Sequence, residues 1–273
     1  MCVNNYTIQI SMKRRQTCLT FTVCMFNMNL SGVCDYLDSL YGDNAIRNAH
    51  QASQIDRGQL YYNTTINNNT KLNSDTELIY GELLLSSVNC IIRYIFDHIG
   101  HHITTTTSSS HNNDTYKFID LGSGNGRCCI GVSLLFSDKL SLCCGIELLP
   151  SLHNIADNAL EQLNSTHPNI QCTPCEFILG DFVKFDWHNY NIVYMNSTMY
   201  SNELMIQLSR LCERLSLGSY VITVSNQLHK SALRMFQLIH TIKQPSSYGT
   251  STCYIYKKMN NNKLANIILR AYK

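Results

Sequence analysis

The chain has 273 residues, of which 44% are hydrophobic and 15% are charged, so it can bury a sizeable core as one large domain or one domain with a small extension. A net charge of +2 gives the molecule as a whole no attraction to nucleic acid or to an anionic membrane. The 13 cysteines are odd in number and fall largely within apolar runs, which argues against a disulfide framework and is typical of a reduced intracellular protein.

The N-terminal 50 residues show no strong hydrophobic period and are predicted to form a poorly structured or strand-like extension. The basic run 13–15 precedes the apolar run 17–26, and residues 1–34 contain no acidic residue, as in an organelle-targeting segment. No clear small-residue cleavage site follows, so targeting stays an alternative. No stretch reaches the roughly 18 apolar residues of a membrane span, and no membrane association is expected.

Two polar tracts divide the chain. Residues 51–75 are interpreted as an Asn/Thr-rich linker before the main domain, residues 76–273, and residues 101–115 as a low-complexity loop within that domain. Both tracts contain too few apolar groups to offset the entropy cost of ordering. Between them apolar residues recur at steps of three and four over residues 83–99, which predicts an amphipathic helix.

From residue 117 onward the pattern alternates between strands and helices. Strands are predicted at 117–121, 141–147, 176–179, 192–195, 220–225, 239–243 and 252–257. Helices are predicted at 128–136, 151–163, 202–215 and around 228–238. This alternation predicts an α/β, Rossmann-like fold with a mostly parallel sheet of seven strands, helices on both faces and an antiparallel C-terminal hairpin at one edge. Ligands in such sheets bind beyond the carboxyl ends of the strands.

The sharpest motif is a glycine-rich turn between the strand that ends at 121 and the helix that follows. Its predicted ligand-binding residues are Asp120, Gly122, Ser123, Gly124 and Gly126. The glycines let the backbone turn tightly and approach a ligand closely, but their spacing is not the dinucleotide fingerprint. An acid before the glycines suits a ligand with an ammonium group and would repel a pyrophosphate. Asp120 therefore favours S-adenosyl-L-methionine over a dinucleotide as the cofactor.

Two further elements follow the next predicted strands. Glu147 lies about 20 residues after the last glycine, where an acid is placed to bind both hydroxyls of a ribose. Asp181 and Phe182 follow the third strand of this domain. A carboxylate there can accept a hydrogen bond from an adenine amino group while the aromatic ring packs on the face of the base. The three elements, in this order on these strands, predict a binding site for the adenosyl part of the cofactor.

Five segments resemble, in order, the disruptor-of-telomeric-silencing family, the non-SET histone-lysine methyltransferases. They are residues 80–83, 120–126, 145–147, 180–182 and 193–197. The resemblance covers roughly residues 76–257, and the chain looks most like the short microbial members of the family. The Tyr-Gly-Glu segment upstream of the glycine loop is the most discriminating piece, because ordinary class I methyltransferases lack it.

The resemblance implies a class I methyltransferase catalytic domain over residues 76–273 that uses S-adenosyl-L-methionine to methylate a lysine amine, with a histone as the substrate. The segment that caps the methionine end of the cofactor is implied to be Tyr80, Gly81, Glu82 and Leu83. Asn196 matches a family asparagine beside the methyl group, which implies that it contacts the cofactor and orients the incoming amine. Tyr200, at a later aromatic position, is implied to be the second catalytic residue.

A lysine amine has to arrive uncharged, although its ordinary pKa is about 10.4, and a narrow apolar channel would lower that pKa by desolvation. The candidate walls of such a channel are Phe182, Met195, Met199 and Tyr200. Ser197 stands where the family typically has a second asparagine, so the shape and polarity of the channel are expected to differ.

By resemblance the partner is a histone in the nucleosome, the compartment is the nucleus and the protein acts as a monomer; the cytoplasm or an organelle stay alternatives. The candidates for DNA phosphate contacts are the run 13–15, Lys257, Lys258 and Lys263. So few charges predict weak, salt-sensitive nucleic-acid binding or none. The single C-x-x-C motif at 172–175 lacks the further ligands of a zinc site, so no metal is expected.

Two other functions stay open. One is methyl transfer to a non-histone protein or a small molecule, which the near-neutral charge and Ser197 favour modestly. The other is a non-catalytic module that binds S-adenosyl-L-methionine without turnover. The cofactor motifs argue against this last reading without excluding it.

Overall fold

The computed structural model describes residues 2–9, 20–66, 78–103 and 115–260. The strands are β1 (Cys2–Gln9), β2 (Thr20–Asn27), β3 (Tyr116–Leu121), β4 (Leu140–Glu147), β5 (Cys175–Leu179), β6 (Ile192–Met195), β7 (Tyr220–Val224), β8 (Phe236–Ser246) and β9 (Gly249–Lys258). The helices are α1 (Leu30–Tyr41), α2 (Ala45–Ile66), α3 (Leu85–Ile103), α4 (Arg127–Leu135), α5 (Pro150–Thr166) and α6 (Asn202–Cys212), with short 3₁₀ turns η1 (Ser197–Met199) and η2 (Ala232–Arg234).

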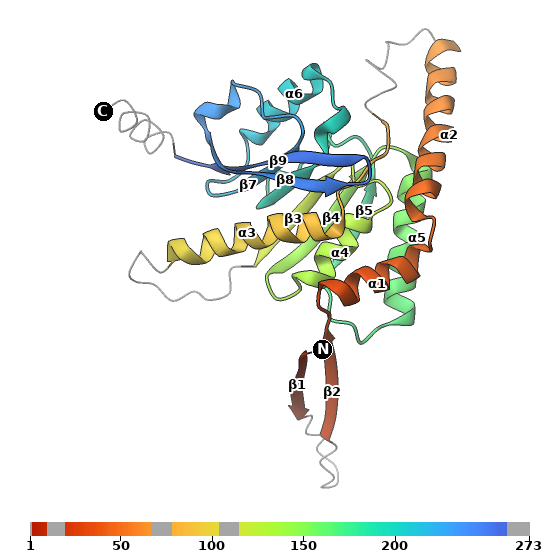
Figure 1. The fold of residues 1–273 in the computed structure, drawn as a ribbon, viewed down its shortest axis with the longest axis vertical. Coiled ribbons are helices and arrows are strands. Elements are labelled where there is room, and N and C mark those ends of the chain that lie inside the picture. Colours follow the sequence, from red (N-terminus) through yellow and green to blue (C-terminus); the bar gives the residue numbers. More distant parts are fainter. Residues whose placement is uncertain (1, 10–19, 67–77, 104–114, 261–273) are drawn as a thin grey trace.

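Within the described residues, the central sheet has seven strands in the order β5-β4-β3-β6-β7-β9-β8 (Figure 1). The strands from β5 to β7 are parallel, and β9 pairs antiparallel with both β7 and β8. The predicted Rossmann-like sheet with an antiparallel C-terminal hairpin at one edge is therefore confirmed. The strand order reverses beside β3, and the carboxyl ends of β3, β4 and β6 meet there, where such folds bind ligands.

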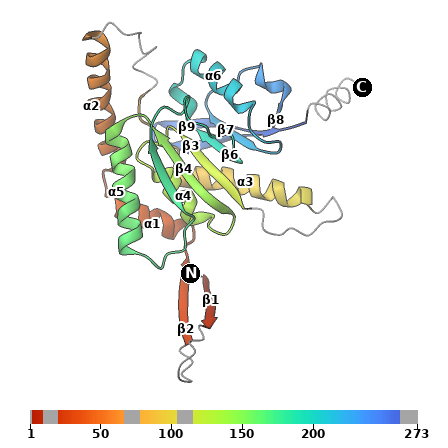
Figure 2. The same ribbon diagram turned by 180° about the vertical axis from the view of Figure 1, so that it is seen from behind.

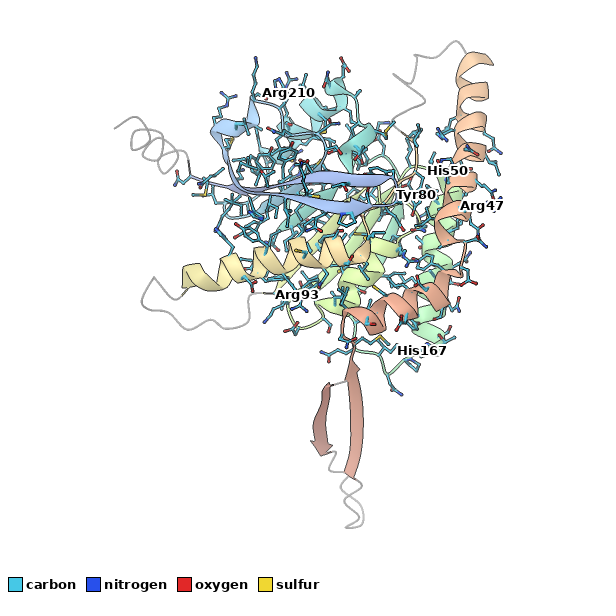
Figure 3. The ribbon with its side chains drawn as sticks, viewed as in Figure 1. Arg47, His50, Tyr80, Arg93, His167 and Arg210 are labelled. Carbon is cyan, nitrogen blue, oxygen red and sulfur yellow. The ribbon has the colours of Figure 1, made fainter. Side chains whose placement is uncertain are left out.

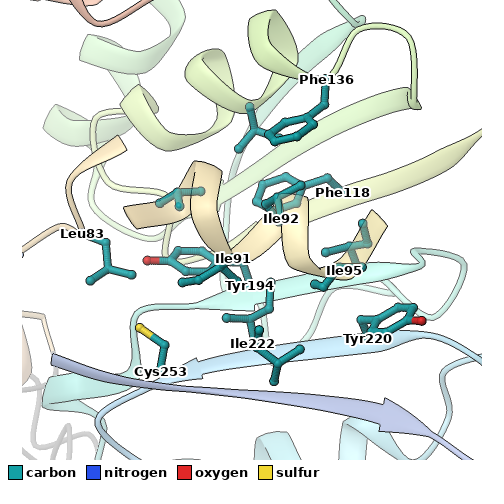
Figure 4. Packing of buried hydrophobic residues seen from close by; sticks show 14 of the residues in the cluster. Leu83, Ile91, Ile92, Ile95, Phe118, Phe136, Tyr194, Tyr220, Ile222 and Cys253 are labelled. Atoms are coloured by element: carbon teal, nitrogen blue, oxygen red, sulfur yellow. The ribbon is translucent and has the colours of Figure 1, made fainter. Parts of the chain in front are cut away.

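The strands of the sheet centre are apolar at successive positions because both of their faces are buried. In β6, Ile192 and Tyr194 join the cluster under α3, while Val193 and Met195 join the cluster on the opposite face. Helices α3 and α4 cover the first face, and α6 covers the second. Helix α3 therefore passes in front of the sheet in Figure 1 and behind it in Figure 2, and Figure 4 shows its isoleucines packed on Phe118 and Tyr194.

The N-terminal region differs from its prediction. Strands β1 and β2 form a hairpin that projects from the body, consistent with a strand-like extension, but α1 and α2 pack on the α/β core (Figure 1). The predicted linker 51–75 is helical up to Ile66, because Ala52 and Leu60 continue the weak apolar face of α2 that packs with Leu149 and Leu152 of the α5 side. Tertiary packing thus overrides a composition that by itself favours a loop. Residues 67–75, the basic run 13–15 and most of the loop 101–115 lie outside the described residues.

The prediction of a helix around residues 228–238 is wrong. The segment makes only the short turn η2, and β8 already begins at Phe236. Leu228, Ala232 and Phe236 recur at steps of four, which suggested a helix, and all three are buried under the second face of the sheet. Pairing with β9, in which Phe236 lies opposite Lys258, extends this segment instead.

No helix among the described residues is long and apolar enough to cross a membrane. 

Helix α1 is expected to unfold together with the catalytic domain. Leu37 is fully buried between α1 and α4, so Leu37→Ala should lower the free energy of unfolding by about 2–5 kcal/mol. The measurement is urea denaturation followed by circular dichroism. Leu217→Ala, at a leucine that is 64% exposed, is the matched control and should change stability by less than about 0.5 kcal/mol. A Leu37→Ala protein with the unfolding midpoint of the wild type would mean that α1 is not part of the cooperative unit.

Candidate active site

A cavity of about 370 Å³ lies at the carboxyl ends of β3, β4 and β6, within the volume range of small-molecule sites. The predicted site residues that line it are Tyr80, Gly81, Gly122, Gly124, Glu147, Asp181, Phe182, Asn196 and Tyr200. The predicted residues Glu82, Leu83, Asp120, Ser123 and Gly126 lie next to these residues in the chain but do not line the cavity. The structure thus brings together side chains from five segments that lie far apart in the sequence.

The glycine loop has backbone conformations that only glycine adopts without strain. Gly122, Gly124 and Gly126 all have positive φ, between 56° and 87°. A Cβ atom at Gly122 would lie 2.7 Å from the hydroxyl of Tyr200, and one at Gly124 would lie 2.5 Å from the ring of Tyr80. The loop therefore forms a cradle in which the backbone itself faces the cavity. Gly126 serves packing instead, because a Cβ there would meet Phe177 of β5.

Asp120 ends β3 with a carboxyl group that is only 2% exposed. Its Oδ1 has no hydrogen-bond partner among the described residues. Burial raises the pKa of Asp120 well above its ordinary value, and the neighbouring charges of Glu147 and Glu82 raise it further. An adjacent positive charge would lower this pKa again and could pair with the free oxygen.

Glu147 ends β4, and backbone amides hold its carboxylate on both sides. Oε2 accepts a 2.8 Å hydrogen bond from the N–H of Gly124, and Oε1 accepts a 2.8 Å bond from the N–H of Leu149. Burial raises the pKa of Glu147, and these backbone hydrogen bonds partly counter that effect. Because each carboxylate oxygen has further lone-pair capacity, Glu147 can still accept from two hydroxyl groups of a ligand in the cavity.

Asp181 and Phe182 follow β5 and also line the cavity, with the ring of Phe182 beside Gly122. The Oδ1 of Asp181 accepts a 2.9 Å bond from the N–H of Val183, and its Oδ2 lies 3.3 Å from the ammonium of Lys184. The ring of Phe182 lies 5.8 Å from that of Tyr200, whose hydroxyl donates a 2.7 Å bond to the carbonyl of Leu121. The two rings give the cavity an aromatic wall.

The segment that precedes α3 is joined to the glycine loop by a chain of polar contacts. The hydroxyl of Tyr80 donates a 2.7 Å bond to Glu82, and the carboxylate of Glu82 lies 4.0 Å from the guanidinium of Arg127 at the start of α4. Arg127 also pairs with Asp38 of α1. Burial raises the pKa of Glu82, and the hydrogen bond from Tyr80 and the charge of Arg127 lower it. Leu83 belongs to the hydrophobic core and not to this chain of contacts.

Asn196 lies where two cavities meet. Its Nδ2 donates a 2.6 Å bond to the carbonyl of Gly81, and its Oδ1 accepts bonds from Thr198 (3.1 Å) and from the hydroxyl of Tyr248 (2.9 Å). A second cavity of about 350 Å³ shares Ile79, Tyr80, Gly81 and Asn196 with the first. Its remaining walls are Ile46, His50, Thr198, Met199, Ser247 and Tyr248. Figure 3 shows Tyr80 and His50 on the same side of the molecule, beside α2.

The sequence reading missed Tyr248, Ile46 and His50 because they lie outside its motifs. The sequence signal nearest to them is the exposed Pro/Ser/Gly turn between β8 and β9, which contains Tyr248. Met195 was predicted to line the acceptor channel, but it is fully buried in the core and lines neither cavity. It packs instead with Val193 and Leu208 in the cluster on the second face of the sheet.

Ser197 does not face the acceptor side. It is fully buried, and its hydroxyl donates a 2.8 Å bond to the carbonyl of Val224 and accepts a bond from the N–H of the same residue. It therefore links the ends of β6 and β7, and Thr198 lines the second cavity instead. Ser197 lines neither cavity, and its expected effect on the shape and polarity of an acceptor channel stays a prediction.

Lys258, one of the predicted DNA contacts, is also buried. Its ammonium donates to the carbonyls of Glu213 and Leu215 after α6, and burial lowers its pKa. The ammonium of Lys257 lies 5.3 Å from the ring centroid of Tyr220. Among the described residues, no group of three His, Cys, Asp or Glu side chains is placed to hold a metal ion.

The sheet order, the glycine loop after β3, the acid after β4 and the cavity beyond the strand ends define a class I S-adenosyl-L-methionine-dependent methyltransferase. A family model described as "Histone methylation protein DOT1" matches residues 62–250. The chain belongs to this family.

Solved structures with a similar fold were also found. An RNA methyltransferase from Salinibacter ruber, in complex with S-adenosyl-L-homocysteine, is 22% identical, covers 53% of this chain and 82% of its own, and has a TM-score of 0.40. Magnesium protoporphyrin IX methyltransferase from Synechocystis PCC 6803, with bound S-adenosyl-L-methionine, is 12% identical, covers 76% and 97%, and has a TM-score of 0.46. No curated protein matches the chain.

Asp120→Asn is expected to raise the stability of the fold while it weakens ligand binding. A raised carboxyl pKa means that the folded chain holds a proton that the unfolded chain releases above about pH 4, so ionisation of Asp120 destabilises the fold as pH rises. The uncharged variant should therefore melt about 2–4 °C higher than the wild type near pH 8, with a smaller difference near pH 5. It should also bind S-adenosyl-L-homocysteine at least ~10-fold more weakly, because a charge-assisted hydrogen bond is lost.

Thermal unfolding at both pH values and calorimetric titration measure the two effects. Glu161→Gln, at an exposed acid of α5, is the control and should change neither quantity. Wild-type affinity in Asp120→Asn would show that this carboxyl group does not bind the ligand.

Proposed function

We propose that the chain is a protein-lysine N-methyltransferase that uses S-adenosyl-L-methionine and acts on a histone. The observation that supports this most is the meeting of two cavities at Asn196, one lined by the cofactor motifs and the other by residues of α2, η1 and the β8–β9 turn. A methyl donor in the first cavity and a side chain in the second would come together at this asparagine. Family membership supports the histone as the acceptor protein.

The residues of the first cavity match the parts of the cofactor. Asp120, with its unpaired buried oxygen, and Glu82 lie just behind the lining of this cavity, within two residues of Gly122 and Gly81, and would bind the methionine ammonium. Glu147, held by the glycine loop, would accept from the ribose hydroxyls. Asp181 would accept from the adenine amino group, and Phe182 would pack on the face of the base.

The second cavity has the walls that a lysine side chain requires. Ile46, Ile79 and Met199 offer apolar contact to the aliphatic stem, and Tyr80 and Tyr248 offer aromatic faces. Removing the ammonium from water lowers its pKa, so the proton can leave to solvent before transfer. The uncharged amine would then replace one of the two donors, Thr198 or Tyr248, that bond the Oδ1 of Asn196, and this new bond would hold its lone pair toward the methyl donor.

The cofactor, when bound, supplies a methyl group on a positively charged sulfur. The chain would contribute mainly the positioning of the uncharged amine against that methyl group. Tyr200, tied to the carbonyl of Leu121, would hold the strand end beneath the reacting atoms. No general base is needed once the amine has lost its proton.

A histone substrate places the protein in the nucleus, acting as a monomer on chromatin. The buried ammonium of Lys258 removes one of the few candidate phosphate contacts. Contact with DNA is therefore weak and salt-sensitive. That same observation favours a second candidate function, methylation of a non-histone protein through the same lysine cavity.

Asn196→Ala tests the proposal. The variant should lose about 100-fold in the rate of methyl transfer, because the amine is no longer held in line, and should keep its affinity for the cofactor within a few-fold. The assay follows radiolabelled methyl transfer to nucleosomes, free core histones, RNA and a whole-cell extract. Asn158→Ala, an exposed asparagine of α5, is the matched control and should transfer at the wild-type rate.

Label in a histone lysine that disappears in Asn196→Ala would support the proposal. Label in another protein only would discard the histone and keep the lysine chemistry. Label in RNA or in a small molecule would overturn the acceptor class. Cofactor binding with no label in any of these acceptors would favour the non-catalytic module.

A further inference from the structure

Helix α2 supports the cofactor cavity without touching it. None of its described residues line that cavity. It nevertheless packs against two of the cavity walls, since Ala49 forms a cluster with Leu149 and Leu152 of the α5 side and with Leu78 and Tyr80 of the segment before α3. Those last four residues all line the cofactor cavity.

Asp56 of α2 caps the N-terminus of α5 from outside that helix. Its Oδ2 accepts a 2.7 Å bond from the N–H of Ser151, and its Oδ1 accepts a 2.7 Å bond from the hydroxyl of the same residue. Helix α5 has Leu149 at its own N-cap position, which provides no side-chain acceptor. Asp56 is 6% exposed and negatively charged, so it satisfies an unpaired N–H and lies favourably at the positive end of the helix dipole.

Ser53, one turn earlier on α2, holds the opposite wall. It is fully buried, and its hydroxyl donates a 3.0 Å bond to the carbonyl of Leu78. Leu78 begins the described part of the segment that leads to Tyr80 and Glu82. Helix α2 is therefore hydrogen-bonded to α5 through Asp56 and to the segment before α3 through Ser53. Both residues lie before the range 62–250 that the family model matches.

The first turns of the same helix reach the other cavity. Ile46 and His50 line the second cavity together with Tyr80 and Asn196. The middle of α2 thus packs against the walls of the cofactor cavity, and its first turns line the acceptor cavity. Figure 3 shows His50 and Tyr80 on the same side of the molecule. Contacts that fix the middle of α2 therefore also fix Ile46 and His50, because all of these residues lie on one helix.

We propose that Asp56 and Ser53 are positioning residues for the cofactor cavity, and that cofactor binding in turn fixes Ile46 and His50 in the wall of the acceptor cavity. Such coupling is reciprocal: contacts of α2 that favour cofactor binding are themselves strengthened by the bound cofactor. The protein then binds its two substrates in order, with the cofactor first. The cofactor half of this coupling needs only the methyltransferase site, whereas the acceptor half rests on the proposed function.

The test uses the full chain and S-adenosyl-L-homocysteine, so it needs no methyl acceptor. Calorimetry should show that Asp56→Ala weakens binding about 10-fold and Ser53→Ala about 3-fold. Asp56→Asn should stay within about 3-fold of the wild type, because asparagine also accepts the N–H bond of a helix cap. Asp97→Ala and Ser86→Ala, at exposed residues of α3, are matched controls and should bind as the wild type does.

Amide hydrogen exchange provides the readout that general destabilisation would not reproduce. In the wild type, ligand should slow exchange both in the glycine loop, residues 122–126, and in residues 45–60 of α2. In Asp56→Ala at saturating ligand, the loop should still be protected while the protection of α2 by ligand is lost. Uniform loss of protection across the fold would instead indicate a merely structural role, and would overturn the proposal.

Wild-type affinity in both Asp56→Ala and Ser53→Ala, or ligand that leaves the exchange of α2 unchanged in the wild type, would also overturn it. If Asp56→Ala does not fold, Ser53→Ala and Asp56→Asn decide the question by the same two measurements. A wild type that shows the coupling but methylates no lysine would reject the proposed function alone. A wild type that methylates lysine without the coupling would reject only this inference.

Discussion

The site is built around a buried carboxyl group at the end of the central strand. Asp120 is almost fully shielded from water, has an oxygen without a partner among the described residues, and lies near the charge of Glu147. Keeping such a group costs stability, and sites of ligand binding are where proteins retain groups of this kind. Gly122, Gly124 and the backbone bonds to Glu147 keep the surrounding loop in one conformation around it.

The remaining architecture holds this loop from outside. Arg127 joins the start of α4 to Asp38 of α1 and to Glu82, and the hydroxyl of Tyr41 donates a 2.9 Å bond to the carbonyl of Asn125 within the loop. The N-terminal helices are therefore part of the catalytic unit and not an appendage to it. The cofactor motifs lie at strand ends, whereas the second cavity is assembled from α2, the segment before α3, η1 and the β8–β9 turn. Of these, α2 and the β8–β9 turn line only the second cavity, so their residues can vary without changing the lining of the first.

Two polar side chains that the sequence pattern assigned to binding surfaces bond to the backbone in the folded chain. Ser197 is used to join β6 to β7, so the loss of an asparagine there leaves the lining of the acceptor cavity to Thr198 and Tyr248. Lys258 is used to satisfy carbonyls after α6, so a basic residue near the C-terminal end contributes nothing to a DNA-binding surface. In both cases a polar side chain that was predicted to lie at the substrate channel or to contact DNA forms hydrogen bonds to the backbone instead, because buried carbonyl and N–H groups need partners.

Most of the sheet was predictable from sequence, since strands such as β6 are apolar throughout and helices such as α3 repeat at three and four residues, and both patterns are local. Asp120, the three glycines and Glu147 were also predictable, because their roles depend on short spacings next to strand ends. Only tertiary structure decided that Asp56 of α2 caps α5, that Phe236 extends a strand, and that Ile46, His50 and Tyr248 meet Asn196. Those outcomes depend on contacts between residues far apart in the chain, and no local period or motif encodes which distant partner will satisfy a helix end, pair with an edge strand or close a cavity.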